Sequence, residues 1–147
     1  MKLLILLLIT FFLSCQAACI EKCECSKFSE INNLNVAVNG EAGCVFNATC
    51  EDTFTVIDLI VKWSGSDITK PSDAAADGRP YFYAESPFTG DLMTIYGIIC
   101  ENGTWYATKY PEGIKYWTVD NAIGFYGTSE ELNGHKSPVY MASCYRN

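Results

Sequence analysis

Positive charge is scarce in this sequence. Lysine and arginine together number 10 against 17 aspartates and glutamates, which gives a formal net charge of −7 at pH 7. Nucleic acids and anionic membrane surfaces are bound through clustered basic residues. The composition therefore argues against both as partners, and it predicts an acidic surface whose main effect is to keep the protein soluble.

Histidine is also scarce, because His135, in a polar loop, is the only one. Serine and cysteine hydrolases need a histidine beside a nucleophile held by strained local geometry, and the sequence has no Gly-x-Ser-x-Gly motif. A single histidine also argues against the usual zinc sites. We therefore predict that the protein is not an enzyme and holds no metal or cofactor. A carboxylate-dependent hydrolase is the remaining enzymatic alternative, because two carboxylates suffice for it.

Long apolar runs are missing beyond the N-terminus. Residues 1–17 combine Lys2, an apolar run and the small residues Cys15 and Ala17, which is the pattern of a secretory signal peptide. The segment ending at Cys15 is also a weak bacterial lipoprotein signal, the less favoured alternative. No other segment offers the roughly 20 apolar residues of a membrane-spanning helix. We therefore predict a secreted, extracellular protein without a membrane span.

Cysteine is plentiful. Eight are present, and the predicted signal peptide removes Cys15. In an oxidising compartment the other seven indicate a disulfide framework of three bridges and one spare thiol, which allows a disulfide-linked dimer. Cys23-Glu24-Cys25 is too tight for a mutual bridge, and zinc is the less favoured reading of this N-terminal group. The seven cysteines are Cys19, Cys23, Cys25, Cys44, Cys50, Cys100 and Cys144.

The segment from Cys44 to Cys50 is expected to be a strand. Its alternation puts both cysteines on one face and Asn47, in the glycosylation sequon Asn47-Ala48-Thr49, on the other. Six extended residues span roughly 20 Å, whereas a disulfide joins Cα atoms about 4.4–6.8 Å apart. Cys44 and Cys50 must therefore pair elsewhere, with Cys100 and Cys144 as candidates in either order.

A hairpin is expected between residues 93 and 110. Asn102-Gly103 lies between two apolar runs, and a type I′ turn needs positive φ at both central residues. This register places Cys100 opposite Trp105, so that the tryptophan lies beside a disulfide. Asn102 also begins the second sequon, Asn102-Gly103-Thr104, and a turn exposes it. We predict glycosylation at Asn47 and Asn102.

The remaining segments predict a β-rich domain. Residues 53–63 indicate a central strand with Asp58 and Lys62 on its wet face, and further strands are expected near 34–38, 115–119, 122–126 and 139–144. Turns are expected at 39–40 and 120–121, a helical turn at 72–77, a short edge strand at 81–83 and a loop at 127–138. We predict a mainly β fold, an antiparallel β-sandwich of seven or eight short strands stapled by disulfides. It comprises a signal peptide (1–17), a cysteine-rich arm (18–33) and one extracellular β domain (34–147).

Aromatic side chains supply the candidate binding residues. Flat rings with polar rims suit the recognition of proteins or sugars. We expect four tyrosines to be exposed: Tyr81, Tyr83, Tyr106 and Tyr110. Three loop acids could hold calcium but lack the spacing of an EF-hand, so we interpret them as solvated: Asp67, Asp73 and Asp77.

The cysteine spacing resembles a known family. Thr49-Cys50, Cys100-Glu-Asn-Gly-Thr-Trp105 and Ser143-Cys144 are similar to the secreted cysteine-rich domains of unknown function that are expanded in nematodes. The resemblance covers residues 19–144 and departs from the family pattern over residues 64–91. It implies the fold class and the compartment, but no activity. Our leading hypothesis is a secreted glycoprotein that binds an extracellular protein or glycan, and the runner-up is a structural or matrix component cross-linked through the odd cysteine.

Overall fold

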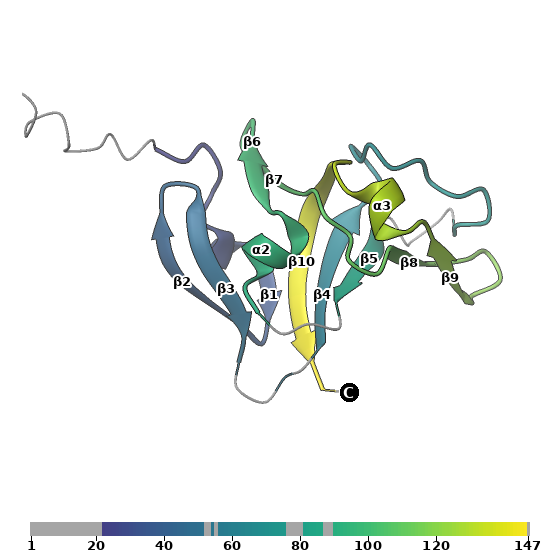
Figure 1. Cartoon of the computed structure of the whole chain (residues 1–147), viewed down its shortest axis with the longest axis horizontal. Helices are drawn as coiled ribbons and strands as arrows, with labels where there is room; N and C mark the ends of the chain where they lie inside the picture. The colour runs from purple at the N-terminus through teal and green to yellow at the C-terminus, as the bar shows by residue number, and fades with distance from the viewer. Residues whose placement is uncertain (1–21, 52–53, 55, 76–80, 87–89, 147) are drawn as a thin grey trace, which may run out of the picture.

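The computed structural model describes residues 22–51, 54, 56–75, 81–86 and 90–146. Cys19 and Asp77 therefore lie outside the described residues. Ten strands alternate with three short helical segments (Figure 1). In chain order the elements are η1 (Phe28–Glu30), β1 (Asn32–Leu34), β2 (Val36–Ala42), β3 (Val45–Cys50), β4 (Val56–Lys62), β5 (Tyr81–Ser86), α2 (Leu92–Tyr96), β6 (Ile99–Glu101), β7 (Thr104–Ala107), β8 (Ile114–Trp117), β9 (Ile123–Tyr126), α3 (Ser129–Leu132) and β10 (Ser137–Tyr145).

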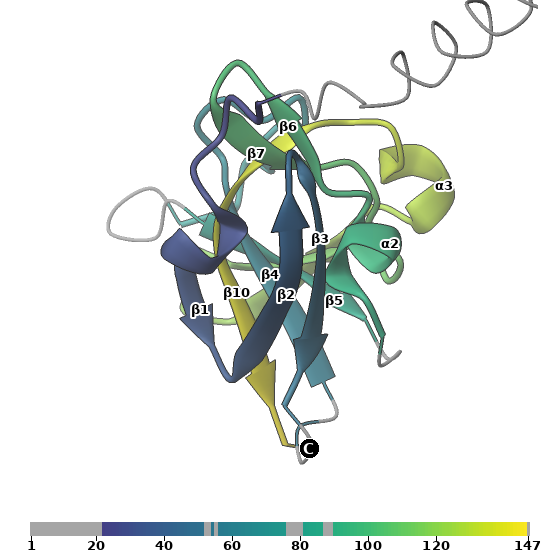
Figure 2. The ribbon, with the colours of Figure 1, turned by 90° about the vertical axis from the view of Figure 1, so that its left-hand side faces the viewer.

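Eight of the strands form one main sheet in the order β6-β7-β10-β4-β5-β8-β9, with β1 paired in parallel to β10. The other pairs of this sheet are antiparallel. The β2–β3 hairpin forms a second, two-stranded sheet, which lies in front of β10 and β4 in Figure 2. The prediction of a mainly β, antiparallel, sandwich-like fold is confirmed, with ten strands instead of seven or eight.

The main sheet has a buried face and a solvated face because its strands alternate. Ile57, Leu59 and Val61 of β4 are completely buried, whereas Asp58 and Lys62 are half-buried on the opposite side. Successive side chains of a strand point to opposite faces of a sheet, so the sequence pattern alone separates the two sides. The central strand with one wet face is therefore confirmed. We call the half-exposed side of β10, β4, β5, β8 and β9 the outer face.

An aromatic cluster joins the two sheets. The rings of Phe28 and Phe46 stack at 4.2 Å between centroids, and Trp105 meets both edge-on at 5.7 and 5.3 Å. The Trp105 indole N–H donates to the backbone oxygen of Ser26 at 2.9 Å, so its one polar group is satisfied. Such edge-to-face pairs each add about 0.5–1.5 kcal/mol beyond the burial of apolar area. The cluster therefore fixes the β2–β3 hairpin and η1 against the main sheet.

Three disulfides hold the same interface. The bridges are Cys23–Cys44, Cys25–Cys100 and Cys50–Cys144. The predictions that neighbouring Cys23 and Cys25 pair elsewhere, and that Cys44 does not pair with Cys50, are confirmed. Cys144 was expected to pair with Cys44 or Cys50, and it pairs with Cys50. Cys100 was expected to pair with the other of these two cysteines, and this is wrong. Cys100 pairs with Cys25 of the N-terminal arm instead of Cys44; η1, at the end of that arm, packs against β1 and β2, and the arm runs toward the β6–β7 hairpin (Figure 2).

The central hairpin has the predicted turn. Asn102 and Gly103 have φ values of 50° and 76°, and Cys100 lies opposite Trp105. Its first strand is much shorter than expected, because residues 92–96 form α2. The Asp91 side chain caps the helix by accepting from the Thr94 N–H, and Gly97 ends it in the left-handed conformation. An N-terminal cap at Asp91 and a left-handed glycine at position 97, six residues apart, thus outweigh the β-branched character of this run.

Other local expectations are corrected. The β2–β3 turn lies at Gly43-Cys44, and residues 39–40 form an irregularity inside β2. β5 runs between β4 and β8, so it is not an edge strand. Ala74 forms a bridge to Thr118 where a helical turn was expected, and the β8–β9 connection is longer than two residues. The expected loop at 127–138 contains α3, whose capping box joins Thr128 and Glu131.

Candidate functional site

The outer face carries a row of side chains that crosses five strands. Each member lies directly opposite the next in the strand register, so the row runs perpendicular to the strands. Every member except Phe125 is half-buried, and Phe125 is 69% exposed. From β10 to β9 this row, which we call the cross-strand row, consists of Met141, Ile60, Tyr83, Lys115 and Phe125.

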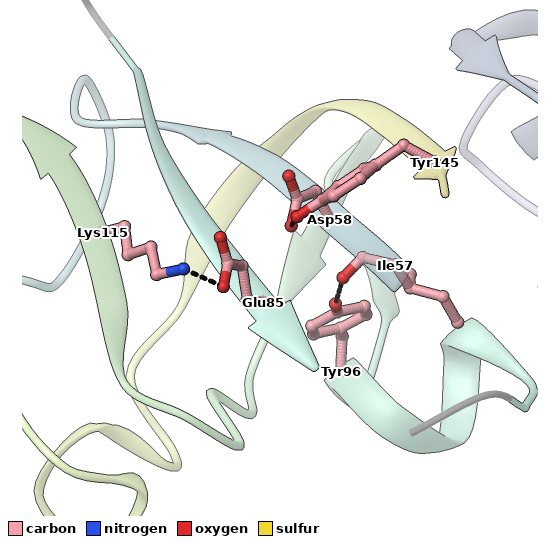
Figure 3. Close-up of polar contacts among 6 residues, drawn as sticks. All are labelled: Ile57, Asp58, Glu85, Tyr96, Lys115 and Tyr145. Carbon is pink, nitrogen blue, oxygen red and sulfur yellow. Dashed lines mark hydrogen bonds and ion pairs between the residues drawn. The ribbon is translucent and has the colours of Figure 1, made fainter. Parts of the chain in front are cut away.

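Charged and hydroxyl groups flank the row on one side. Asp58 lies opposite Glu85 on β5 and opposite Ser143 on β10. The Lys115 ammonium forms an ion pair with Glu85 and also lies 5.5 Å from the centre of the Phe125 ring. Figure 3 shows this ion pair and, on the other side of Asp58, the hydroxyl of Tyr145. The Tyr145 hydroxyl donates to an Asp58 carboxylate oxygen at 3.4 Å.

The Asp58 carboxyl is electrostatically unusual. Burial, followed by the nearby charge of Glu85, raises the pKa of Asp58 to about 6, against a partial lowering by the Tyr145 hydrogen bond. Among the described residues, Lys115 forms an ion pair with Glu85 and no lysine forms one with Asp58, so the lysine offsets little of the effect of burial on the pKa of Asp58. The Asp58 carboxyl therefore changes its charge near pH 6, beside a Glu85 side chain that forms an ion pair with Lys115.

Tyrosines flank the row on its other side. Tyr81 lies opposite Lys62, and its ring stacks on that of Tyr140 at 4.2 Å between centroids. The Lys62 ammonium lies 5.4 Å from the centre of the Tyr140 ring. The strand register shifts between Val139 and Met141, and the extra residue at this bulge is Tyr140. Bulges redirect side chains in this way, so the irregularity places Tyr140 on the outer face.

The predicted binding tyrosines separate into three environments. Tyr81 and Tyr83 both lie on the outer face, half-buried. Tyr106 is half-buried on β7, which β10 and β4 separate from β5. Tyr110 was expected to be exposed, and this is wrong. It is completely buried, its hydroxyl donates to Ser137 at 2.6 Å, and burial raises its pKa to about 12.

The two calcium candidates within the described residues have different partners. Asp67 accepts from the backbone N–H of Lys136, and Asp73 accepts from the Tyr116 hydroxyl. His135 is exposed and borders a shallow cavity of about 310 Å³ with Asp67 and Glu131. Among the described residues, one group of potential metal ligands is close enough, and all three of its sulfurs belong to disulfides: Cys23, Cys25 and Cys100.

Both sequons lie away from the outer face. Asn47 is exposed on β3, and Asn102 is exposed at the tip of the β6–β7 hairpin. In Figure 1 these elements lie on the opposite side of the molecule from β8 and β9. Glycans at these positions would leave the outer face open. No helix within the described part of the chain is long and apolar enough to cross a membrane.

The sequence placed Asp58 and Lys62 on the solvated side of their strand and gave Tyr81 and Tyr83 as binding candidates, but the other residues of the outer face were missed. Glu85, Lys115, Phe125, Tyr140 and Tyr145 lie on four segments far apart in the chain. Strand alternation could have placed Glu85 beside Tyr81 and Tyr83 on one face of β5. The pairing of β5 with β4 and β8 is non-local, so no short-range signal assembles the cross-strand row.

Comparison with known proteins gives one family. The family model described as "TRA-1 regulated protein R03H10.4" matches residues 21–144, nearly the whole chain after the predicted signal peptide. No match was found among curated proteins or among solved structures.

Proposed function

The chain belongs to the family of TRA-1 regulated proteins, whose description states no activity, and we propose from the geometry of the outer face that it acts as a secreted, non-catalytic binding domain. One observation carries this proposal. A row of mainly apolar and aromatic side chains, interrupted by Lys115 and ending in Phe125 at 69% exposure, crosses the sheet and has polar groups on both sides over β4 and β5. Exposed apolar patches with polar rims are typical of interaction sites.

The scaffold suits a recognition role. Three disulfides and the aromatic cluster hold the sheets together behind the outer face, so the recognition side chains are fixed on strands and not on loops. Disulfides persist in oxidising compartments, which supports a secreted protein. The predicted glycans at Asn47 and Asn102 would cover other surfaces. The expected partner is an extracellular protein or glycan.

The proposal is tested with the secreted protein on arrays of extracellular proteins and glycans. Ligands of the wild type should be lost by the double variant Tyr83→Ala/Phe125→Ala, because both rings leave the outer face. Val45→Ala is the matched control, since Val45 is 68% exposed but lies on β3. Thermal unfolding of each variant shows whether it is folded. Ligands that bind both variants equally would show that the outer face is not the binding site.

A second candidate function rests on the cysteine pairing. The three bridges use six of the seven cysteines expected in the secreted chain, which leaves Cys19. A free thiol at this position would support a structural component cross-linked into dimers. Non-reducing electrophoresis should then show a dimer that reduction and Cys19→Ser both convert to monomer. A monomer in both lanes would exclude this function.

A further inference from the structure

Resting on the proposed function, we infer that the outer face binds a neutral oligosaccharide that lies across the strands, along the cross-strand row. The inference goes beyond a generic binding face, because it states the chemical class of the ligand and its direction. Four features of the outer face carry it: its balanced charge, the spacing of its rings, its two polar borders and the paired backbone beneath it.

Charge is balanced on this face although the chain is acidic. Asp58 and Glu85 are accompanied by Lys62 and Lys115, whereas the whole chain has a net charge of −7. Complementary potentials favour partners of opposite charge, and like charges facing each other are costly. A locally neutral surface on an acidic protein therefore suits an uncharged ligand better than a polycation or a polyanion.

Two rings stand along the row at separate positions. Tyr83 and Phe125 lie on β5 and β9 with β8 between them, and neighbouring strands are about 4.8 Å apart, so their backbones are about 10 Å apart. Lys115 fills the position between the two rings and is held there by Glu85 and by the face of Phe125. The C–H groups of one sugar face can pack on such rings while the hydroxyl groups point sideways. The row thus offers two stacking positions for one chain of sugars.

Polar groups border the row on both sides where it crosses β4 and β5. Along a strand, residues of the same face are about 6.8 Å apart. Asp58 and Glu85 therefore follow one border of the row, and Tyr81 and Lys62 follow the other. Hydrogen bonds from hydroxyl groups to an ionised carboxylate are stronger than neutral ones. A linear oligosaccharide carries hydroxyl groups along both of its edges, and over β4 and β5 this matches a row with acceptors on one side and donors on the other.

The position of the row argues against strand addition by a peptide. Peptides that extend a sheet pair with the free backbone of an edge strand. The row crosses β4, β5 and β8, and each of these strands is already paired on both sides. A ligand on this part of the face must therefore bind through side chains. A protein that docks with its own side chains is the remaining alternative, and the experiment below distinguishes it.

The test combines an array of neutral oligosaccharides with calorimetry on two related probes. Chitohexaose is neutral, and its deacetylated counterpart, the chitosan hexamer, is cationic with the same backbone. We expect the wild type to bind at least one neutral oligosaccharide on the array and to prefer the neutral member of the pair. Tyr83→Ala and Phe125→Ala should each weaken binding at least tenfold. Val45→Ala should change it less than threefold, and Tyr83→Phe, which keeps the ring, should weaken it less than Tyr83→Ala.

The outcomes separate this inference from the proposed function. If no neutral oligosaccharide binds, or if Tyr83→Ala binds as well as the wild type, the inference is wrong. If extracellular proteins bind instead and Tyr83→Ala/Phe125→Ala abolishes that binding, the sugar class is wrong and the proposed binding function stands. If no ligand of either class depends on the outer face, both fail.

Discussion

Asp58 and Glu85 lie directly opposite each other on β4 and β5, and only Glu85 has a lysine partner. The two strands therefore place two carboxyl groups side by side on a partly solvated face, where like charges oppose each other. A carboxylate-dependent hydrolase, the enzymatic alternative, would need such a pair of carboxyl groups. The pair exists, but it lies on a sheet surface and one of its members is held in an ion pair. Its first consequence is for stability.

The pH dependence of stability should reflect Asp58. Its pKa is about 6 in the folded protein and about 3.9 in an unfolded chain. Between about pH 4 and pH 6 the folded protein binds more protons than the unfolded chain, so this carboxyl makes stability fall as pH rises through that window. Asp58→Asn should remove this fall and raise the free energy of unfolding at pH 7 by about 1 kcal/mol, after allowance for solvent screening.

This prediction is measured by urea unfolding at several values between pH 4 and pH 7. Asp120→Asn is the matched control, because Asp120 is exposed and no described carboxylate lies opposite it in the strand register. Wild type and Asp58→Asn should converge toward pH 4 and diverge toward pH 7. Parallel profiles for the two proteins would contradict the raised pKa of Asp58.

Removal of the Cys50–Cys144 bridge should destabilise the protein more than removal of Cys23–Cys44. The first joins residues 94 apart in sequence and the second joins residues 21 apart. A longer closed loop restricts the unfolded chain more, which in the chain-entropy model predicts a difference of roughly 1 kcal/mol on a cost of about 3–5 kcal/mol. Urea midpoints of the double alanine variants under oxidising conditions measure both. The opposite order would show that native-state contacts outweigh loop entropy.

The Asp91 side chain should contribute more to the stability of the fold than an ordinary helix cap does. One carboxylate oxygen accepts from the Thr94 N–H, and the other accepts from the Ala48 N–H of β3 at 3.0 Å. Asp91→Ala should therefore cost about 2–3 kcal/mol, the sum of a lost cap and an unsatisfied donor. Thr94→Val is the control, because it removes only one exposed side-chain bond to Asp91. Equal effects on thermal unfolding would show that the contact with β3 adds no stability.

Glycosylation can be tested without changing either asparagine. Thr49→Val and Thr104→Val destroy the two sequons but keep the β-branched shape of the side chain and the left-handed Asn102 of the turn. Intact mass of the protein secreted from a eukaryotic host should fall by one glycan in each variant, and deglycosylation should bring all forms to the mass of the polypeptide. A wild-type mass equal to the bare polypeptide would mean that the exposed sequons stay empty.

Features set by neighbouring residues were predictable from the sequence. Asn102-Gly103 determined its hairpin, and the alternation around Asp58 determined which side of β4 is wet, because both depend on local conformation. Tyr110 shows the limit of this reasoning. If the strand that contains Trp105 continued, alternation would put Tyr110 on the face opposite Trp105, which is why we expected it to be exposed. Instead β7 ends at Ala107, and the chain then turns Tyr110 into the core. Alternation says nothing beyond the end of a strand.

The outer face could be predicted only in parts. Tyr81 and Tyr83 followed from their aromatic character, but Lys115 and Phe125 join them through the pairing of β5, β8 and β9. A bulge in β10 places Tyr140 on the outer face, and no residue near Tyr140 in the sequence predicts that bulge. The disulfide of Cys100 was assigned wrongly for a similar reason, since its partner depends on where the N-terminal arm folds.

The main sheet cannot form completely until β10 is available, because β10 is one of its central strands. The last strand in sequence lies between β7 and β4 in the middle of the main sheet, also pairs with β1, and carries Cys144. During synthesis, β4 can pair with β5 but lacks its second neighbour until residues 137–145 have emerged, and contacts between distant segments form slowly. We therefore expect nascent chains to expose the flank of β4 and to depend on chaperones until residues 137–145 have emerged. Deletion of residues 137–145 would accordingly split the sheet at its centre instead of trimming its edge.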